Sequence, residues 1–275
     1  MKKLNLLFVS LFSVLLSAQT ISGTIVSKED QQPIPYAKIG IENEATGTFS
    51  DEKGAFSLNI SSSDSQNKVV IAVPGYETFT EKVERFKLQN PKQILLQEKT
   101  KLIETVAINP KKLVEKNWGV NTKTKSVTYN VNPKFNKESF LGETALEFNT
   151  KKRAKIKNIN LNIAEINADK PVILRYTIYN DEKNRPGTSL LEEEITVELT
   201  KDQIKDGVFS LDVNDQNIWV QGKFYVGIQF VKEFDGNIGI SAALFRTGYM
   251  RQFYGKWEKV SIAAPAINID VKVEK

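Results

Sequence analysis

Short runs in which apolar and polar residues alternate occupy most of this chain. In the run 36–41, Tyr36 and Lys38 fall on one face and three apolar residues fall on the other, which is the two-residue period of a half-buried β-strand. Segments rich in Gly, Pro, Asn and Asp separate the runs, as expected for turns. Because no segment keeps the 3.6-residue period of a long amphipathic helix, the pattern predicts an all-β protein.

The N-terminal part of the pattern, residues 19–98, predicts a small β-sandwich. Asp51 and Gly54 indicate a tight hairpin, because Asp at the first turn position accepts a backbone hydrogen bond and Gly at the fourth suits the turn. About seven short strands within about 80 residues are typical of a sandwich. The expected strands are 20–26, 36–41, 48–50, 55–60, 68–73, 76–83 and 93–96.

The larger C-terminal part, residues 124–275, predicts a second sandwich of antiparallel strands. About nine or ten strands within roughly 150 residues favour a jelly-roll-like architecture, with a single helical turn at 200–206. Residues 99–123, where Pro110 interrupts the apolar pattern, are predicted to form a linker. The expected strands are 126–131, 143–148, 154–166, 171–179, 190–199, 207–213, 223–232, 237–244, 256–262 and 266–273.

Several short motifs occur in order along the N-terminal region. They are ISGTI at 21–25, PIPYAKI at 33–39, TGT at 46–48, SDEKGAF at 50–56 and PGY at 74–76. Together they resemble the carboxypeptidase-regulatory-like domain, a prealbumin-like sandwich of seven strands. In the Bacteroidetes such domains commonly begin outer-membrane receptors and other exported proteins. The resemblance covers about a third of the chain and implies an accessory module without catalytic residues of its own.

The first residues have the layout of a secretory signal peptide. Lys2 and Lys3 precede an apolar run at 4–16, and the small residues Ser17 and Ala18 follow. The run is shorter than the roughly 20 apolar residues of a membrane-spanning helix. We therefore expect a signal peptide at 1–18, cleavage after Ala18, no later transmembrane segment, and a final location in the periplasm, at the outer membrane or outside the cell.

The composition excludes several function classes. The chain has neither Cys nor His, so it cannot form a Ser-His-Asp triad, a Cys-His pair or a His-bearing zinc site. Loss of Lys2 and Lys3 would lower the formal net charge from +5 to +3, which does not favour a nucleic-acid partner. We expect a non-enzymatic binding or structural module of the cell envelope, although carboxylate chemistry stays open.

The stretch 245–257 is the richest in candidate binding chemistry, with five aromatic residues and three cations. Aromatic faces stack against sugar rings while polar side chains bind hydroxyls, so this stretch favours carbohydrate binding as the alternative function. A hairpin whose aromatic side chains pack on the sandwich explains the same pattern. The partner is then an envelope protein or a glycan. The candidate ligand-binding residues are Arg246, Tyr249, Arg251, Tyr254 and Trp257.

Two acidic groups are further candidates. Asp212, Asn214 and Asp215 provide the spaced oxygens that a structural calcium ion prefers, but they fit an ordinary turn as well. We expect no other cofactor. Glu192 and Glu194 would share one face of a strand, and paired carboxylates can hydrolyse glycosidic bonds. A charged outer face on an edge strand is the favoured interpretation of this pair.

Overall fold

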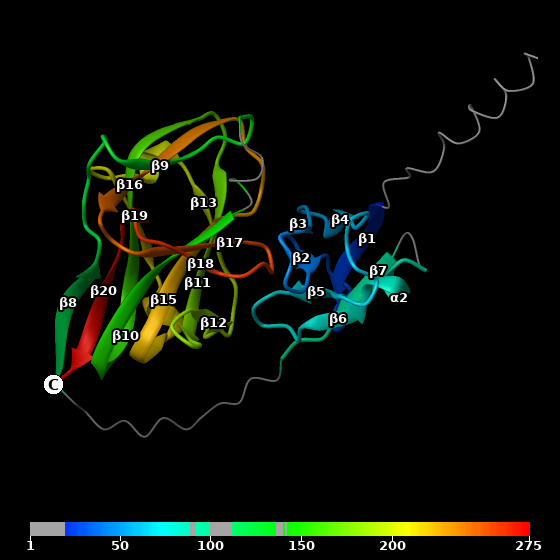
Figure 1. Cartoon of the computed structure of the whole chain (residues 1–275). Helices are drawn as coiled ribbons and strands as arrows, with labels where there is room; N and C mark the ends of the chain where they lie inside the picture. The colour runs from blue at the N-terminus through cyan, green and yellow to red at the C-terminus, as the bar shows by residue number, and fades with distance from the viewer. Residues whose placement is uncertain (1–19, 89–91, 100–111, 136–139, 141) are drawn as a thin grey trace, which may run out of the picture.

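Two all-β domains make up the structure, a computed structural model that describes residues 20–88, 92–99, 112–135, 140 and 142–275 (Figure 1). The all-β prediction is confirmed, with one short helix and two 3-10 turns among the described elements. The predicted signal peptide at 1–18 lies outside the described residues. The helices of the described part are all too short and polar to count as candidate membrane spans.

The N-terminal domain is the predicted seven-stranded, prealbumin-like sandwich, drawn blue to cyan in Figure 1. One sheet has the order β4-β1-β7 and the other β3-β2-β5-β6, with a short helix α2 (Val83–Phe86) that sequence analysis missed. Ile25, Ile39 and Phe86 are fully buried in the core between the sheets. The strands are β1 (Thr20–Ser27), β2 (Lys38–Ile41), β3 (Gly47–Phe49), β4 (Ala55–Asn59), β5 (Lys68–Ala72), β6 (Phe79–Lys82) and β7 (Lys92–Leu96).

The connection between β3 and β4 has the predicted turn, but the predicted hairpin is wrong, because β3 pairs with β2 and β4 pairs with β1 in the other sheet. Asp51 Oδ1 accepts hydrogen bonds from the backbone N–H groups of Lys53 at 2.8 Å and Ala55 at 2.9 Å. Gly54 adopts a φ of +73°, and a Cβ there would lie 2.4 Å from the carbonyl oxygen of Ile25. Asp51 is therefore a turn residue, and Gly54 is required by both conformation and space.

The C-terminal domain is the larger antiparallel sandwich, drawn green to red in Figure 1. Its main sheet path is β12-β11-β15-β10-β16-β19, and the other strands pair at its sides. Two 3-10 turns are present, η1 (Lys201–Gln203) within the predicted helical turn and η2 (Asn214–Gln216). The strands are β8 (Leu113–Gly119), β9 (Thr128–Val131), β10 (Gly142–Ala168), β11 (Val172–Asp181), β12 (Pro186–Ser189), β13 (Ile195–Leu199), β14 (Val208–Asp212), β15 (Trp219–Phe230), β16 (Gly236–Leu244), β17 (Gly248–Gln252), β18 (Glu258–Val260), β19 (Ala263–Pro265) and β20 (Ile267–Glu274).

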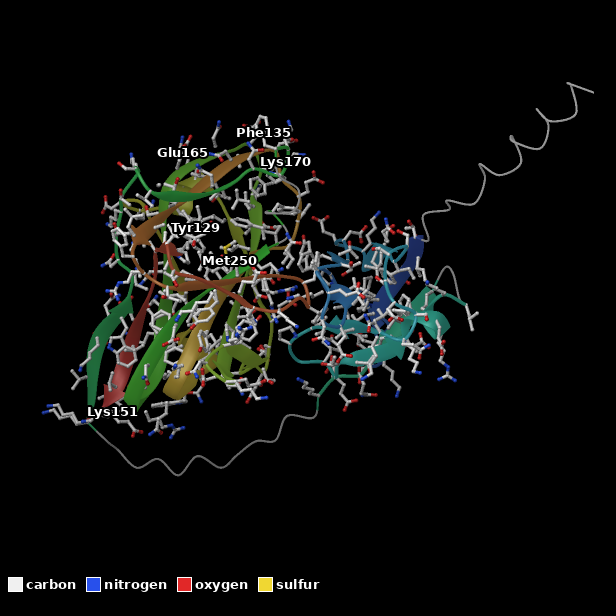
Figure 2. The ribbon with its side chains drawn as sticks, viewed as in Figure 1. Tyr129, Phe135, Lys151, Glu165, Lys170 and Met250 are labelled. Atoms are coloured by element: carbon white, nitrogen blue, oxygen red, sulfur yellow. The ribbon has the colours of Figure 1, made fainter. Side chains whose placement is uncertain are left out.

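One long strand, β10, organises this domain. It has 27 residues and pairs with β14, β15, β16, β17 and β20. The pattern predicts two strands here, 143–148 and 154–166, but the charged residues between them form a register shift at Thr150–Ala154 instead of a turn. Lys151, labelled in Figure 2, projects from this shift at the exposed end of the sheet. A bulge allows one continuous strand to bend and join both layers.

Strand β8 lies inside the segment 99–123 that the pattern predicts as a linker. It pairs antiparallel with β20 from Leu113↔Glu274 to Gly119↔Asn268. The C-terminal domain therefore begins before residue 124. Most residues of β8 are exposed because it is an edge strand, so its sequence lacks the apolar face that identifies a strand. Strand β12 likewise falls between two of the expected strands, 171–179 and 190–199.

Candidate functional site

The tip of the hairpin that joins β17 and β18 inserts into the N-terminal domain. Phe253 is 2 % exposed, and its ring centroid lies 5.4 Å from that of Phe49. A Cβ at Gly47 would lie 2.2 Å from Cγ of Phe253, and one at Gly40 would lie 2.8 Å from Cδ2 of Tyr254. The two glycines therefore leave the space that the hairpin tip occupies, and the packing of the tip in that space connects the two sandwiches directly.

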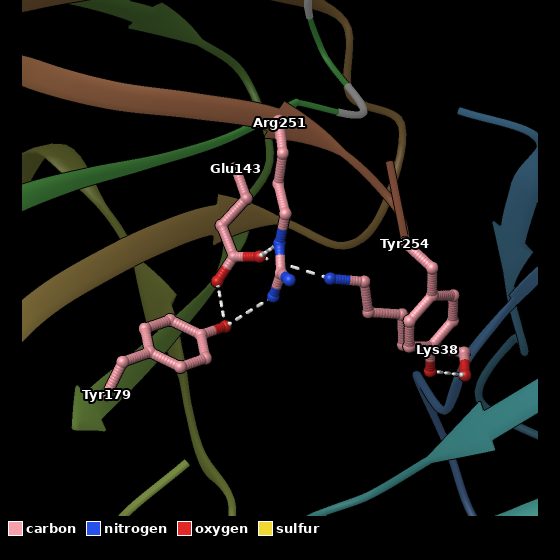
Figure 3. A network of polar contacts seen from close by, with 5 residues as sticks. All are labelled: Lys38, Glu143, Tyr179, Arg251 and Tyr254. Carbon is pink, nitrogen blue, oxygen red and sulfur yellow. Dashed lines mark hydrogen bonds and ion pairs between the residues drawn. The ribbon is translucent and has the colours of Figure 1, made fainter. Parts of the chain in front are cut away.

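A buried polar network lies directly beneath this hairpin tip (Figure 3). Glu143 Oε2 accepts a hydrogen bond from Lys38 Nζ at 3.1 Å and one from Arg251 Nε at 2.9 Å. Its Oε1 accepts a hydrogen bond from the hydroxyl of Tyr179, and that hydroxyl accepts one from Arg251 Nη2 at 3.0 Å. The hydroxyl of Tyr254 donates to the carbonyl oxygen of Lys38 at 3.0 Å. Lys38 belongs to the N-terminal domain, so the network joins both domains.

Burial and charge act together on the pKa values of this network. Burial by itself would raise the pKa of Glu143, but the adjacent cations Arg251 and Lys38 outweigh it and hold the pKa at about 2. Burial and the nearby Arg251 charge lower the pKa of Lys38 to about 7, against the favourable effect of Glu143. The side chain is 2 % exposed, so Glu143 is a covered carboxylate that is ionised at neutral pH.

Two further contacts cross between the domains. Arg175 Nη2 donates to the carbonyl oxygen of Tyr36 and also pairs with Glu194 at 2.8 Å. Lys232 Nζ pairs with Glu52 Oε1 at 2.6 Å, where both side chains are about half exposed or more. The exposed pair contributes little, because solvent screens it. The buried Arg175 contact and the Glu143 network are the main polar connections between the sandwiches.

The aromatic residues of 245–257 do not share one open face. Tyr249 and Trp257 are 3 % and 6 % exposed, and both pack on the outer face of the sheet with Tyr225 and Tyr179. Trp257 also lies beneath the guanidinium of Arg251, 4.3 Å from its ring centroid. The interpretation of a hairpin packed on the sandwich therefore describes Tyr249 and Trp257, whose buried rings do not form a platform for stacking sugars.

The predicted site residues are consequently divided between two places. Arg251, Tyr254 and Trp257 belong to the joint between the domains, whereas Arg246 is exposed and lines a separate groove. Tyr249 is buried and lines the same groove as Arg246, and its hydroxyl donates to Glu147 at 2.9 Å. These residues are close together in the sequence, but Arg246 precedes β17, whereas Arg251 lies near its end and Tyr254 and Trp257 follow it, so they reach different surfaces.

The acidic candidates form local structure. Asp212 Oδ1 accepts the backbone N–H of Asn214 at 2.8 Å, which is an ordinary turn at the start of η2, and Asp215 is exposed. Among the described residues no three acidic side chains are grouped to hold a metal ion. Glu192 and Glu194 lie in a bend before β13, so the expectation of a shared strand face is wrong.

Comparison with known proteins identifies one part of the chain. The profile of the CarboxypepD_reg-like domain family matches residues 21–108. The N-terminal domain is a carboxypeptidase-regulatory-like domain. Its match extends beyond the boundary at 98 that the strand pattern predicts, into residues outside the described part. The search of curated proteins yields no match.

A search of solved structures gives a match to a chain described as "Structure of infectious bursal disease virus Gx strain". The identity is 10 % and the TM-score 0.22, with 93 % of this chain and 63 % of that chain covered. This chain therefore spans less than two thirds of the viral chain's length, and the low TM-score carries no argument about fold or function.

The sequence pattern does not identify Glu143 and Lys38, which form the buried ion pair between the carboxypeptidase-regulatory-like domain and its neighbour. Alternation correctly places Lys38 away from the apolar face of β2 that packs on the core, and that outer face is normally read as solvated. Lys38 is nevertheless buried because the hairpin tip covers it. One indication was present in the sequence: Gly40 and Gly47 leave this outer surface without side chains.

Proposed function

We propose that this chain is an exported, non-enzymatic module of the bacterial cell envelope that binds an envelope protein or a glycan. In it the carboxypeptidase-regulatory-like domain is held in one orientation against the larger sandwich. The observation that carries this proposal is the Glu143 network. The most strongly perturbed carboxylate of the described residues is covered and neutralised by Arg251 and Lys38, which suits a structural joint between binding domains.

Two features of the sequence support the proposal. The residues 1–18 have the layout of an export signal, and the absence of His and Cys removes the commonest catalytic groups. A carboxylate-dependent glycosidase is the less favoured alternative. It needs two carboxyl groups roughly 5–10 Å apart that face the substrate, whereas the carboxylate of Glu194 is engaged by Arg175 and Thr196.

Fractionation of a bacterial host that produces the full chain tests this proposal. We expect the protein in the envelope or the medium, with an N-terminus created by cleavage after Ala18. We also expect no turnover of a panel of chromogenic glycosides and esters. Retention of the uncleaved chain in the cytoplasm, or turnover that Glu194→Gln abolishes, would overturn the proposal.

A further inference from the structure

A groove of about 690 Å³ lies on the C-terminal domain, beside the edge strand β8 and the turn that precedes β17. It is separate from the joint between the domains. The groove is lined by the end of β8, by residues 146–149 of β10, by residues 245–247 with Tyr249, and by Lys259 of β18. Its lining includes the aromatic and polar side chains of Trp118, Asn149, Phe245, Arg246 and Lys259.

The pairing of β10 explains why the groove is open. On one edge β10 pairs with β17 as far as Leu146↔Gly248, and on the same edge it pairs with β20 from Ala154↔Val273 onward. Among the described strands none pairs with residues 147–153 on this edge. The groove lies next to this interruption, since Leu146, Phe148 and Asn149 line it. It is therefore formed by the backbone arrangement and does not depend on the rotamer of one side chain.

The charge of the groove favours an anionic ligand. Arg246 and Lys259 are both exposed, and neither forms an ion pair with another described residue. The carboxylate within the groove, Glu147, is already bound by the hydroxyl of Tyr249 at 2.9 Å and lies 3.6 Å from Lys223 Nζ. Two cations thus face the groove with their hydrogen-bond donors available, and the negative charge beside them is compensated.

The apolar walls favour a ligand with flat hydrophobic faces. Phe245 is 91 % exposed, and its φ of +57° is a conformation that a bulky residue rarely adopts. A hydrogen bond of 2.9 Å from its backbone N–H to the carbonyl oxygen of Ile262 holds this turn. Trp118 is partly exposed on the opposite side of the groove. The fold therefore keeps an aromatic ring in solvent next to two cations, at a conformational cost.

We propose that this groove binds an acidic saccharide, that is, a glycan whose sugars carry carboxylates. Arg246 and Lys259 bind the carboxylates, and Phe245 and Trp118 contact the apolar faces of the sugar rings. The exposed amide of Asn149 binds hydroxyls. The amino group of Asn117 already donates to Asn268 at 2.8 Å and to Asp270 at 2.9 Å, so it holds the rim of the groove in place. This inference rests on the proposed binding function and names the ligand class of one surface. A polyanion recognised by charge alone would not require the exposed ring of Phe245.

Calorimetric titration of the purified, exported chain with oligogalacturonate tests the proposal. We expect saturable binding that falls about tenfold in each of the variants Arg246→Gln, Lys259→Gln and Phe245→Ala, because each removes one charged or stacking contact. Fully methyl-esterified oligogalacturonate and poly-glutamate serve as comparison ligands. The first retains the rings without the charge, the second the charge without the rings, and we expect both to bind at least about tenfold more weakly than the uronate.

The matched controls are Lys256→Gln and Phe135→Ala. Lys256 is an exposed cation of the same hairpin outside the groove, and Phe135 is an 89 % exposed aromatic residue at the far end of the domain (Figure 2). Both should leave binding unchanged. Equal losses in groove and control variants, no saturable uronate binding, or poly-glutamate binding as tight as uronate would refute the inference.

The two exposed charge substitutions keep the test valid if Phe245→Ala unfolds the turn, which a melting curve detects. Failure of the acidic-saccharide inference is also distinguishable from failure of the proposed function. A chain that is exported and lacks turnover but binds no uronate contradicts only the acidic saccharide. A chain that stays in the cytoplasm or turns over a substrate contradicts the proposed function.

Discussion

Glu143→Gln is the perturbation that tests the joint between the domains most directly. Gln has nearly the same shape as Glu, so the packing around it stays the same while its negative charge is lost. Lys38 and Arg251 then face each other without a counter-charge, in a site where the side chain of Lys38 is 9 % exposed and that of Arg251 is 15 % exposed. The cost is therefore electrostatic and not the cost of a cavity.

The structure sets the expected magnitude. Removing one partner of a buried ion pair typically costs about 3–5 kcal/mol, because the remaining charge is left uncompensated. Arg251 cannot lose its proton, but Lys38 can, since burial and Arg251 already lower the pKa of Lys38 to about 7. Deprotonation of Lys38 relieves part of the repulsion. We therefore expect Glu143→Gln to lower the free energy of unfolding by about 3 kcal/mol at pH 6, and by less at pH 9.

Tryptophan fluorescence during urea unfolding provides the assay. All three tryptophans, Trp118, Trp219 and Trp257, lie in the C-terminal domain, so their signal reports that domain, while circular dichroism reports both. The control is Glu147→Gln, because Glu147 is about a third exposed and its ion pair with Lys223 is longer, at 3.6 Å. A loss below about 1 kcal/mol for Glu143→Gln, or an equal loss for Glu147→Gln, would refute the assignment of Glu143 as the buried joint.

Other perturbations give independent outcomes. Gly47→Ala places a Cβ 2.2 Å from Cγ of Phe253, so we expect it to expel the hairpin tip and to lower the free energy of unfolding by about 1–3 kcal/mol. X-ray scattering detects the separated domains as a larger radius of gyration. The pKa of Glu143 is lowered from 4.5 to about 2, so its ionised form stabilises the folded state fully above pH 4.5, and this stabilisation is lost as pH falls through 2. Melting temperatures measured across this pH range should show the acid loss in the native chain and not in Glu143→Gln. Asp51→Ala removes two backbone hydrogen bonds from an exposed turn and should cost about 1 kcal/mol by thermal melting. A chelator should leave the melting temperature unchanged, because Asp212 bonds the backbone of its own turn; a fall in melting temperature that added calcium reverses would restore the calcium alternative.

Local patterns were sufficient for most of the strands. In β2 the alternating apolar residues pack on the core, and between β3 and β4 Asp51 and Gly54 make the predicted turn. The pattern failed at β8, an edge strand with little buried surface, and at 150–154, where charged residues mark a bulge and not a turn. Both failures have one cause. Exposed residues are free to be polar whether they lie in a strand, a bulge or a linker.

The sequence by itself determined the all-β class, the prealbumin-like N-terminal sandwich and the exclusion of Cys and His chemistry, because each depends on local pattern or on composition. Only the tertiary structure decided the roles of the functional candidates. Arg246 and Arg251 are five positions apart and occupy unrelated surfaces, whereas Lys38 and Glu143 are 105 positions apart and form one ion pair. A pairing of that kind depends on how two finished sandwiches pack together, and no periodicity within either one records it.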